Sequence, residues 1–392
     1  MKFLVLNRRR ILDRLHHWFP PGELVVLTAS SALGGADPGG FHHLEVVEDY
    51  DSPATDTRIE RLAEKFAVDA VLLTAEIDVL RAARLRERLG LPGQGIESAV
   101  AYRNKYVMKT GAAAAGIPVA AMRPVTRPEE VAEFAAEHGY PVVVKRFDGA
   151  AAMGMHVYRS EAGLPPDGWP APMLAEQWIE GDLCHVDGVM RAGEVLLSWP
   201  SRYLHSQWAS ASESANELGG MLSRQDPLFE PLRKATARVI AALPPAPDAL
   251  PFHAEFFATP DGELVLCEIA CRAGGGEIVE MFERAFGVNL YEAGLKGQAG
   301  RYDEISWRAE PRRHGWGWMP RRAGVLLEIP AKPASEAVCS YSVSGIPGTE
   351  YAAPRGMADV IARMVFTMDG ADVRPELHAL DEWWSRTTRW DR

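Results

Sequence analysis

The first hundred residues alternate short apolar runs with amphipathic segments, and this alternation restricts the possible folds more than any other feature. Apolar runs lie at residues 3–6, 24–28, 44–47 and 70–74, and helical patterns lie at 58–66 and 77–89. Strands that alternate with helices predict a parallel sheet with helices on its faces. We therefore expect an α/β domain over residues 1–100. No GxGxxG follows the first strand, so we do not predict a dinucleotide site.

Size and charge narrow the class of protein. A chain of 392 residues is too long for one small core and predicts two or three subdomains. The formal net charge of −11 argues against a general affinity for nucleic acid or anionic membranes. No apolar run approaches the roughly 20 residues of a membrane helix. The arginines at 8–10 follow the first apolar run instead of preceding it, unlike a signal peptide, so we expect a cytoplasmic protein.

The rest of the chain mixes helices with strands and hairpins. We expect helices at residues 102–115, 129–138 and 231–243, strands at 141–145 and 173–179, and hairpins at 184–198 and 252–269. Gly139 is a candidate left-handed helix cap. Residues 205–226 are polar and lack periodicity, which predicts a loop. Many short β-like runs follow residue 302, which predicts a β-rich C-terminal region, and the fold class as a whole is α/β with α+β character.

Lys145 is the first residue that indicates chemistry. The chain has eight lysines against 34 arginines, and Lys145 directly follows a buried strand. The loop after it, residues 148–154 (DGAAAMG), has the small side chains that let backbone N–H groups approach phosphate oxygens. This loop is not a GxxxxGK[ST] motif. A phosphate-binding lysine is therefore one interpretation, and a strand-end lysine before an ordinary hairpin is the other.

Glu255 and Glu268 lie in apolar strands of one predicted hairpin, where an ionised carboxylate is costly unless it is compensated. A two-residue turn at Asp261 and Gly262 would place the two glutamates opposite each other, with Cβ atoms about 5 Å apart. Two like charges at that distance repel each other, and a magnesium ion would reverse the sign of the interaction. A three-residue loop would place the glutamates on opposite faces, as edge charges.

Arg272 begins the sequence RAGGG shortly after Glu268. An arginine with flexible glycines beside an acidic metal site can bind a phosphoryl group in transit. The alternative is a glycine-rich turn with a surface arginine.

Together, these features resemble the ATP-grasp superfamily over about residues 1–330. The resemblance implies a Rossmann-like pre-ATP-grasp domain at 1–100, an ATP-grasp domain at 101–300 with subdomains 101–175 and 176–300, and a β-rich region at 301–392. It also implies ATP and Mg²⁺, or Mn²⁺ in its place, as cofactors.

The resemblance implies roles for individual residues. Arg272 and Lys145 are the implied catalytic residues, and Glu255 and Glu268 are the implied metal ligands. The implied ATP-binding residues are Lys105, Lys145, Asp148, Gly149, Gly154, Glu176, Gln177, Trp178, Ile179 and Asp182. Within this set Glu176 would bind the adenine amino group, and Asp182 would replace the acidic ribose ligand that aligns with Leu183. The sequence departs from the family at Ala270, where a metal-binding Asn is usual.

The N-terminal region, residues 315–329 and the sequence EIACR resemble the biotin-carboxylase-like branch and its L-amino-acid ligases. These ligases form an amide between small carboxylate and amine substrates through an acyl phosphate, releasing ADP and phosphate. A homodimer is left open, and nucleic acid and membrane partners are not expected. Candidate substrate residues are Arg202, His205, Glu213, Glu217, Gly274 and Gly275; solvated polar side chains are the alternative for the first four. Residues 148–154 and 205–226 are the candidate lids.

Three other functions remain open. One is a carboxylase that uses bicarbonate, and another is a tailoring ligase that acts on a peptide or a natural-product intermediate. The third, from a different class, is a nucleotide-binding regulator without turnover. A protein without turnover has little need of the metal pair, and Glu255 and Glu268 are both present.

Overall fold

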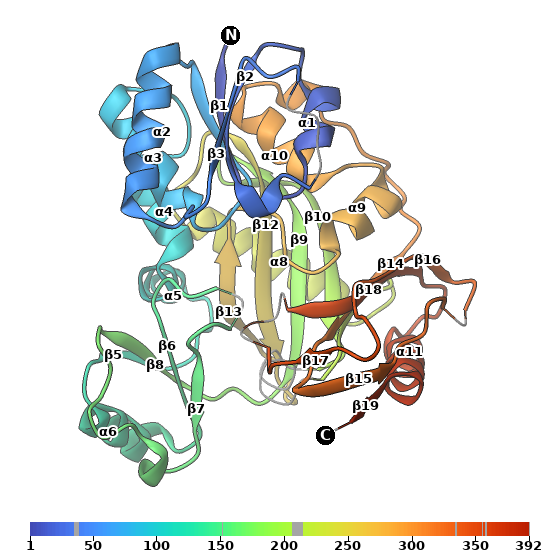
Figure 1. The fold of residues 1–392 in the computed structure, drawn as a ribbon. Helices are drawn as coiled ribbons and strands as arrows, with labels where there is room; N and C mark the ends of the chain where they lie inside the picture. The colour runs from blue at the N-terminus through green and yellow to red at the C-terminus, as the bar shows by residue number, and fades with distance from the viewer. Residues whose placement is uncertain are drawn as a thin grey trace.

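The computed structural model describes residues 1–34, 39–150, 152–205, 215–333, 335–354, 356 and 359–391. Three units stand out in Figure 1: an N-terminal α/β unit, a small four-stranded sheet and a large eight-stranded sheet.

The N-terminal unit contains the predicted parallel sheet. Its strands are β1 (Phe3–Asn7), β2 (Leu24–Ala29), β3 (His43–Val47) and β4 (Ala70–Leu73), in the order β3-β2-β1-β4. Alternate side chains of each strand enter two different cores. Leu4 and Leu6 pack with α2 (Pro53–Phe66) and α3 (Asp78–Leu89), while Phe3 and Val5 pack with α1 (Leu12–Trp18) and α10 (Leu290–Gln298). The second layer thus includes a helix from a distant part of the chain, as Figure 1 shows.

The small sheet is antiparallel. Its strands are β5 (Met122–Val125), β6 (Val142–Lys145), β7 (His156–Tyr158) and β8 (Met173–Gln177), in the order β5-β8-β6-β7. Helix α6 (Pro128–His138) covers one face through Val131 and Phe134. After α6, Gly139 has φ 81° and ψ 164°, so the prediction of a left-handed cap there was wrong.

The helix predicted at 102–115 is two helices, α4 (Ile96–Arg103) and α5 (Lys105–Ala114). The side chain of Asn104 accepts hydrogen bonds from the backbone N–H groups of Tyr106 and Val107, which begins a new helix. Asn is a strong N-cap residue because it satisfies N–H groups that have no partner within the helix.

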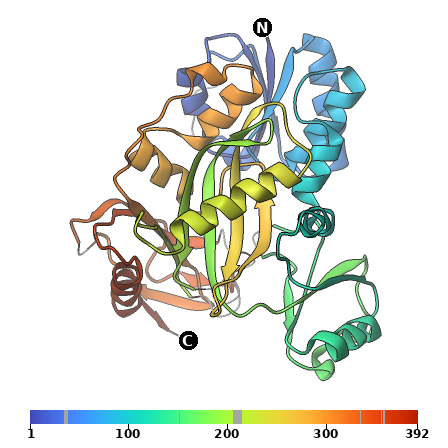
Figure 2. The ribbon, with the colours of Figure 1, turned by 180° about the vertical axis from the view of Figure 1, so that it is seen from behind.

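The large sheet has the order β13-β12-β9-β10-β11-β14-β18-β16. Its strands are β9 (Asp182–Arg191), β10 (Glu194–Tyr203), β11 (Glu217–Met221), β12 (Ala249–Ala258), β13 (Leu264–Ala270), β14 (His314–Pro320), β16 (Val338–Val343) and β18 (Val360–Thr367). Helix α8 (Phe229–Ala242) crosses one face of it, as Figure 2 shows, and α9 (Ile278–Phe286) lies beside β14. Three strands that follow residue 301 continue this sheet, so the sheet has no break at the predicted boundary near residue 300.

The C-terminal part also forms a second, three-stranded sheet. It contains β15 (Gly324–Glu328), β17 (Glu350–Tyr351) and β19 (Arg389–Asp391), with α11 (Arg374–Thr387) beside the large sheet. No helix within the described ranges is long and apolar enough to cross a membrane.

The prediction of a loop at 205–226 was wrong for residues 217–221, which form β11 between β10 and β14. Two glycines in this strand interrupt the alternation of apolar and polar side chains by which a strand is predicted. A Cβ on Gly219 would lie 2.9 Å from Nε1 of Trp316, and one on Gly220 would lie 2.6 Å from Sδ of Met368. Large neighbours therefore occupy the space that side chains would need. Residues 206–214, including the predicted Glu213, lie outside the described residues.

Gly297 tests whether the close approach of α10 to β12 stabilises the fold. A Cβ there would lie 1.9 Å from the carbonyl oxygen of Ala249, so Gly297→Ala should lower the free energy of unfolding by about 1–3 kcal/mol, as overpacking does. In Gly111→Ala, within α5, the nearest atom is a side-chain carbon of Leu243 at 3.4 Å. This control should be neutral or gain up to about 1 kcal/mol from helix propensity. Urea unfolding measures both, and equal values would contradict the prediction.

Candidate active site

A cleft of about 410 Å³ lies where the three units meet. Arg9 and Glu76 line it from the N-terminal unit, Lys145 and Glu176 from the small sheet, and Glu255 and Glu268 from the large sheet, together with other residues. Charged side chains from distant parts of the chain thus meet in one partly apolar cleft. We therefore take this cleft as the candidate active site.

Lys145 lies in the cleft wall and is buried. Its Nζ lies 2.8 Å from one carboxylate oxygen of Glu176, and Nζ of Lys109 lies 2.6 Å from the other. Burial raises the pKa of Glu176, but the two lysines outweigh it and lower the pKa to about 2. The carboxylate of Glu176 thus positions two lysines, and it also lines the cleft, so its contact with an adenine amino group stays a prediction.

The sequence analysis missed Lys109. It lies four residues after Lys105 on α5, and the two side chains therefore share one helix face. Two of only eight lysines at this spacing were an available signal. Lys109 is 1% exposed, and burial lowers its pKa although Glu176 opposes this.

The segment 176–179, which was predicted to bind ATP and is here called the hinge, lies at the cleft. Gln177, Trp178 and Ile179 line the cleft. Asp182, the predicted ribose ligand, is not among the described lining residues, and its carboxylate lies 2.6 Å from the guanidinium of Arg374 in α11. The structure therefore gives the Asp182 carboxylate a partner outside the cleft.

The predicted phosphate loop joins β6 to β7. Gly149 lines the cleft, whereas Asp148 and Gly154 do not appear among the lining residues that the structure describes. The carboxylate of Asp148 pairs with Arg146 at 3.1 Å. Lys105 contacts both sides of the cleft, because its Nζ donates to the carbonyl of Gly149 and pairs with Glu268, each at 2.7 Å.

Glu255 and Glu268 are directly opposite each other, as predicted, but the turn is different. Near the turn Ala258 is opposite Leu264 and the backbone N–H of Thr259 donates to the carbonyl of Glu263, which leaves a three-residue loop at 260–262. A β-bulge between Glu255 and Phe256 then shifts the register by one residue and restores the pairing of the two glutamates. The predicted pairing is confirmed, and the two-residue turn that was given as its reason is wrong.

Each glutamate has its own partners, which offset the expected repulsion. The hydroxyl of Tyr203 donates to Glu255 at 3.0 Å, and Nε2 of His253 lies 3.3 Å from the same oxygen. Burial raises the pKa of Glu268, but Lys105 and then Lys145 outweigh it and lower the pKa to about 2. Both carboxylates line the cleft from adjacent strands, and such an oxygen pair can hold a divalent cation.

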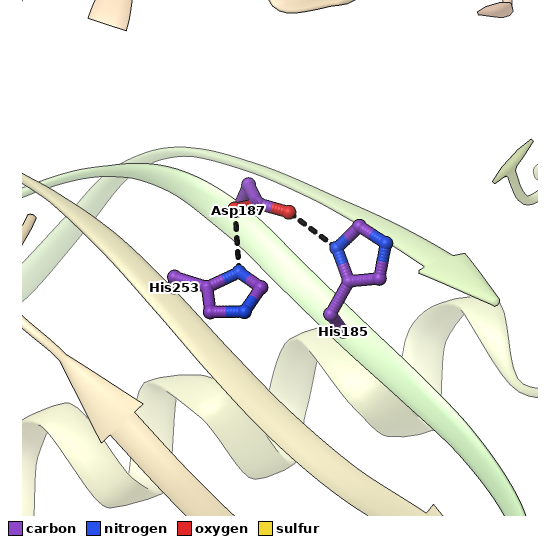
Figure 3. Close-up of side chains that lie close together, drawn as sticks. All are labelled: His185, Asp187 and His253. Carbon is purple, nitrogen blue, oxygen red and sulfur yellow. Dashed lines mark hydrogen bonds and ion pairs between the residues drawn. The ribbon is translucent and has the colours of Figure 1, made fainter. Parts of the chain in front are cut away.

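Behind Glu255, Asp187 accepts hydrogen bonds from two imidazoles (Figure 3). Nδ1 of His185 lies 2.5 Å from one oxygen and Nδ1 of His253 lies 2.8 Å from the other. Ligands about 2.0–2.1 Å from a tetrahedral metal lie about 3.3 Å apart, so these shorter distances fit hydrogen bonds better than a metal site. Burial lowers the pKa of His253, but Asp187 outweighs it and raises the pKa to about 10. His253 is therefore a cation that connects Asp187 with Glu255.

Glu76 holds Arg272 at the cleft. It pairs with Nε of Arg272, and its other oxygen lies 2.9 Å from a guanidinium nitrogen of Arg103. Burial raises the pKa of Glu76, but Arg272 and Arg103 outweigh it and lower the pKa. The sequence analysis missed Glu76, although an acidic residue just beyond a buried parallel strand is a recognisable signal.

The predicted substrate residues divide into two groups. Glu217 and Gly275 line the cleft. Burial, followed by the nearby Glu255, raises the pKa of Glu217 to about 8. Gly274 lies against the cluster behind Glu255, since a Cβ there would be 2.7 Å from Asp187 and 2.8 Å from His253.

Arg202 and His205 are not among the described residues that line the cleft. Arg202 is adjacent to Tyr203 in β10, so the two side chains lie on opposite faces of the sheet. The guanidinium of Arg202 lies 3.9 Å from the carboxylate of Asp182 and 4.0 Å from that of Asp226. His205 lies 3.3 Å from Asp381 of α11. Their partners are therefore structural acidic residues.

Comparisons with known proteins agree with this architecture. No protein-family model matches the chain. The chain is 28% identical over 272 residues to an L-arginine-specific L-amino acid ligase of Bacillus subtilis. The matched region is 67% of this chain and 65% of the length of that ligase. Among solved structures, an L-amino acid ligase from Bacillus licheniformis has a TM-score of 0.74 at 16% identity and covers 100% of this chain and 99% of that one.

A biotin carboxylase domain from Hydrogenobacter thermophilus, in complex with MgADP and bicarbonate, has a TM-score of 0.65 at 16% identity, with 100% and 90% coverage. The chain therefore has the ATP-grasp fold. Within that class, both the sequence and the structure comparisons find L-amino acid ligases among its similar proteins.

Asp187→Asn tests whether the buried cluster stabilises the fold. The change removes a charge that two buried imidazoles share, and breaking a buried pair typically costs about 3–5 kcal/mol. The free energy of unfolding from urea titration should fall by that amount. Asp182→Asn is the control, because Asp182 forms an exposed pair with Arg374 and should change stability by less than about 1 kcal/mol. A loss no larger than the control's would mean that the cluster is not a stabilising unit.

Proposed function

We propose that this chain is an ATP-dependent carboxylate–amine ligase that joins amino acids or small carboxylic acids through an acyl phosphate and releases ADP and phosphate. The observation that carries the proposal is the arrangement of one cleft, where Lys105, Lys145 and Arg272 face the carboxylates of Glu255 and Glu268. Phosphoryl transfer depends mainly on positioning and on stabilising charge, and this set of groups supplies both.

The nucleotide would lie between the two sheets. Backbone groups at Gln177 and Ile179 border the place for the base, and Lys145 and Lys105 border the place for the phosphates. Glu255 and Glu268 would hold Mg²⁺, which would neutralise charge on the phosphate oxygens. Ala270 leaves two glutamates as the proposed protein ligands at this hairpin, where the resemblance to the ATP-grasp superfamily implies an additional Asn. The fit rests on two cleft-facing carboxylates that are directly opposite each other.

The donor carboxylate would attack the γ-phosphate of ATP and displace ADP, and the amine would then attack the carbonyl of the acyl phosphate, lose a proton and release phosphate. Arg272, held by Glu76, is placed to stabilise the transferring group. Glu217 lies where it would meet a substrate ammonium group, whose positive charge would lower the raised pKa of Glu217 and favour its carboxylate form. An acyl phosphate hydrolyses readily, so the loop that contains Gly149 would exclude water when it closes.

The nucleotide product tests the mechanism. With ATP, Mg²⁺ and pairs of L-amino acids, we expect phosphate release with ADP as the product, because the reactive end of the nucleotide lies at the γ-phosphate. Chromatography of the turnover mixture measures this. Formation of AMP and pyrophosphate would exclude an acyl phosphate, and phosphate release that requires bicarbonate instead of an amine would favour a carboxylase.

Glu268→Gln should abolish most ligase activity, because it removes a proposed metal ligand. It should also destabilise the free protein, since the buried ammonium group of Lys105 loses its carboxylate partner. Loss of the repulsion between Glu255 and Glu268 would by itself stabilise the protein slightly, so the melting temperature shows which of the two effects is larger. The second measurement is the shift in melting temperature that Mg²⁺ and an ATP analogue produce in the parent and in Glu268→Gln, because a ligand of the native state raises the melting temperature. An active variant with an unchanged magnesium-dependent shift would remove the hairpin as the metal site.

A further inference from the structure

We propose that Arg9 binds the carboxylate of the amino acid that supplies the attacking amine. The inference rests on the proposed ligase function and deepens it. It makes the acceptor an amine that also carries a carboxylate, and it makes Arg9 a residue that determines specificity.

Arg9 lies where an α/β sheet usually binds its ligands. It follows the carboxyl end of β1, and Glu76 follows the carboxyl end of the neighbouring strand β4. The chain passes from β1 to β2 on one side, while β4 lies on the other side of β1, so the crevice between β1 and β4 is a switch point. Both Arg9 and Glu76 line the cleft.

The position of Arg9 is fixed by its neighbours. The buried side chain of Asn7 accepts a hydrogen bond from the backbone N–H of Arg9 at 3.0 Å and donates one to its carbonyl at 2.9 Å. The amide of Asn7 is in turn held by Thr28 at 2.9 Å. The guanidinium lies 5.8 Å from the ring centroid of Tyr291 in α10, which supports its flat face.

Arg9 differs from the other cations among the described residues that line the cleft. Each of the others has a carboxylate partner: Lys105 with Glu268, Lys145 with Glu176, Arg146 with Asp148, His253 with Asp187 and Arg272 with Glu76. The guanidinium of Arg9 forms no hydrogen bond or ion pair within the described part of the chain, and its Nε is buried without a hydrogen-bond partner. A buried donor without a partner is costly, and an anionic ligand would relieve this cost.

The chemistry of ligation indicates which anion Arg9 binds. The donor carboxylate must lie at Arg272 and the metal hairpin, and the phosphates lie at the lysines. An acceptor amino acid keeps its own carboxylate free while its amine attacks, and this carboxylate needs a cation that is not already paired within the described part of the cleft. A guanidinium suits a carboxylate because it can donate two parallel hydrogen bonds.

The neighbouring arginines provide matched controls. Arg8 pairs with Asp51 at 2.9 Å, and Nε of Arg10 lies 3.4 Å from the carbonyl of Ser31. Both are exposed, and neither is among the described lining residues. Arg10→Met therefore changes the same loop by the same side-chain substitution without reaching the cleft.

The kinetic test compares acceptors that differ only in the carboxylate. Standard L-amino acids and their primary amides would be used as acceptors with a fixed, different donor. Arg9→Met should raise KM for the free acids by roughly 10- to 100-fold, the loss expected for a hydrogen bond to a charged group. KM for the amides, for the donor and for ATP should stay the same, Arg9→Lys should recover part of the loss, and Arg10→Met should match the parent. Equal effects on acids and amides, or a raised KM for ATP or donor, would overturn the proposal.

A binding measurement keeps this inference separate from the proposed function. Melting temperature would be followed with a non-hydrolysable ATP analogue, Mg²⁺ and either an L-amino acid or its amide. A shift that requires the carboxylate and is lost in Arg9→Met supports the site even if no pair of substrates turns over. A parent that shows no difference between acid and amide refutes the Arg9 site, and phosphate release then still decides on the ligase.

Discussion

The contacts of Lys105 connect the parts of the molecule that form the cleft. One ammonium group pairs with Glu268 on the large sheet and donates to the carbonyl of Gly149 in the loop of the small sheet. The side chain is almost fully buried, so its charge requires these partners. The same requirement applies to Glu176, which needs both Lys109 and Lys145. The position of one sheet relative to the other is thus coupled to the pairing of buried charges.

This arrangement also explains how a cleft with two opposed glutamates can be stable. Glu268 is offset by Lys105, and Glu255 receives hydrogen bonds from Tyr203 and the cationic His253. His253 is itself held by Asp187. A bound metal–nucleotide complex would therefore exchange partners with Lys105 instead of simply relieving a repulsion. Exchange of this kind couples nucleotide binding to the loop at Gly149, because Lys105 contacts both.

The N-terminal unit contributes to the same cleft through strand ends. Glu76 and Arg9 follow neighbouring parallel strands, and Glu76 holds Arg272 of the large sheet. Helix α10, which comes nearly two hundred residues later than this unit, packs on its sheet and places Tyr291 beneath Arg9. The unit is therefore part of the candidate site as well as a neighbour of it. The guanidinium of Arg9, which has no partner among the residues that the structure describes, distinguishes the proposed acceptor side from the phosphate side.

The sequence alone determined the local elements, because strand and helix periodicity depends on residues close in the chain. The parallel sheet at β1–β4, the hairpin at β12 and β13, and the lysine at the end of β6 were all predictable in this way. The bulge that pairs Glu255 with Glu268, the strand formed by residues 217–221 and the burial of Lys109 were decided by tertiary contacts. Register, glycine packing and charge pairing each depend on a partner far away in the sequence, and no local pattern specifies that partner. For this reason the sequence indicated which residues carry the chemistry, and only the folded structure showed that Glu176 holds lysines, that Asp182 pairs outside the cleft and that Arg9 remains unpaired within the described residues.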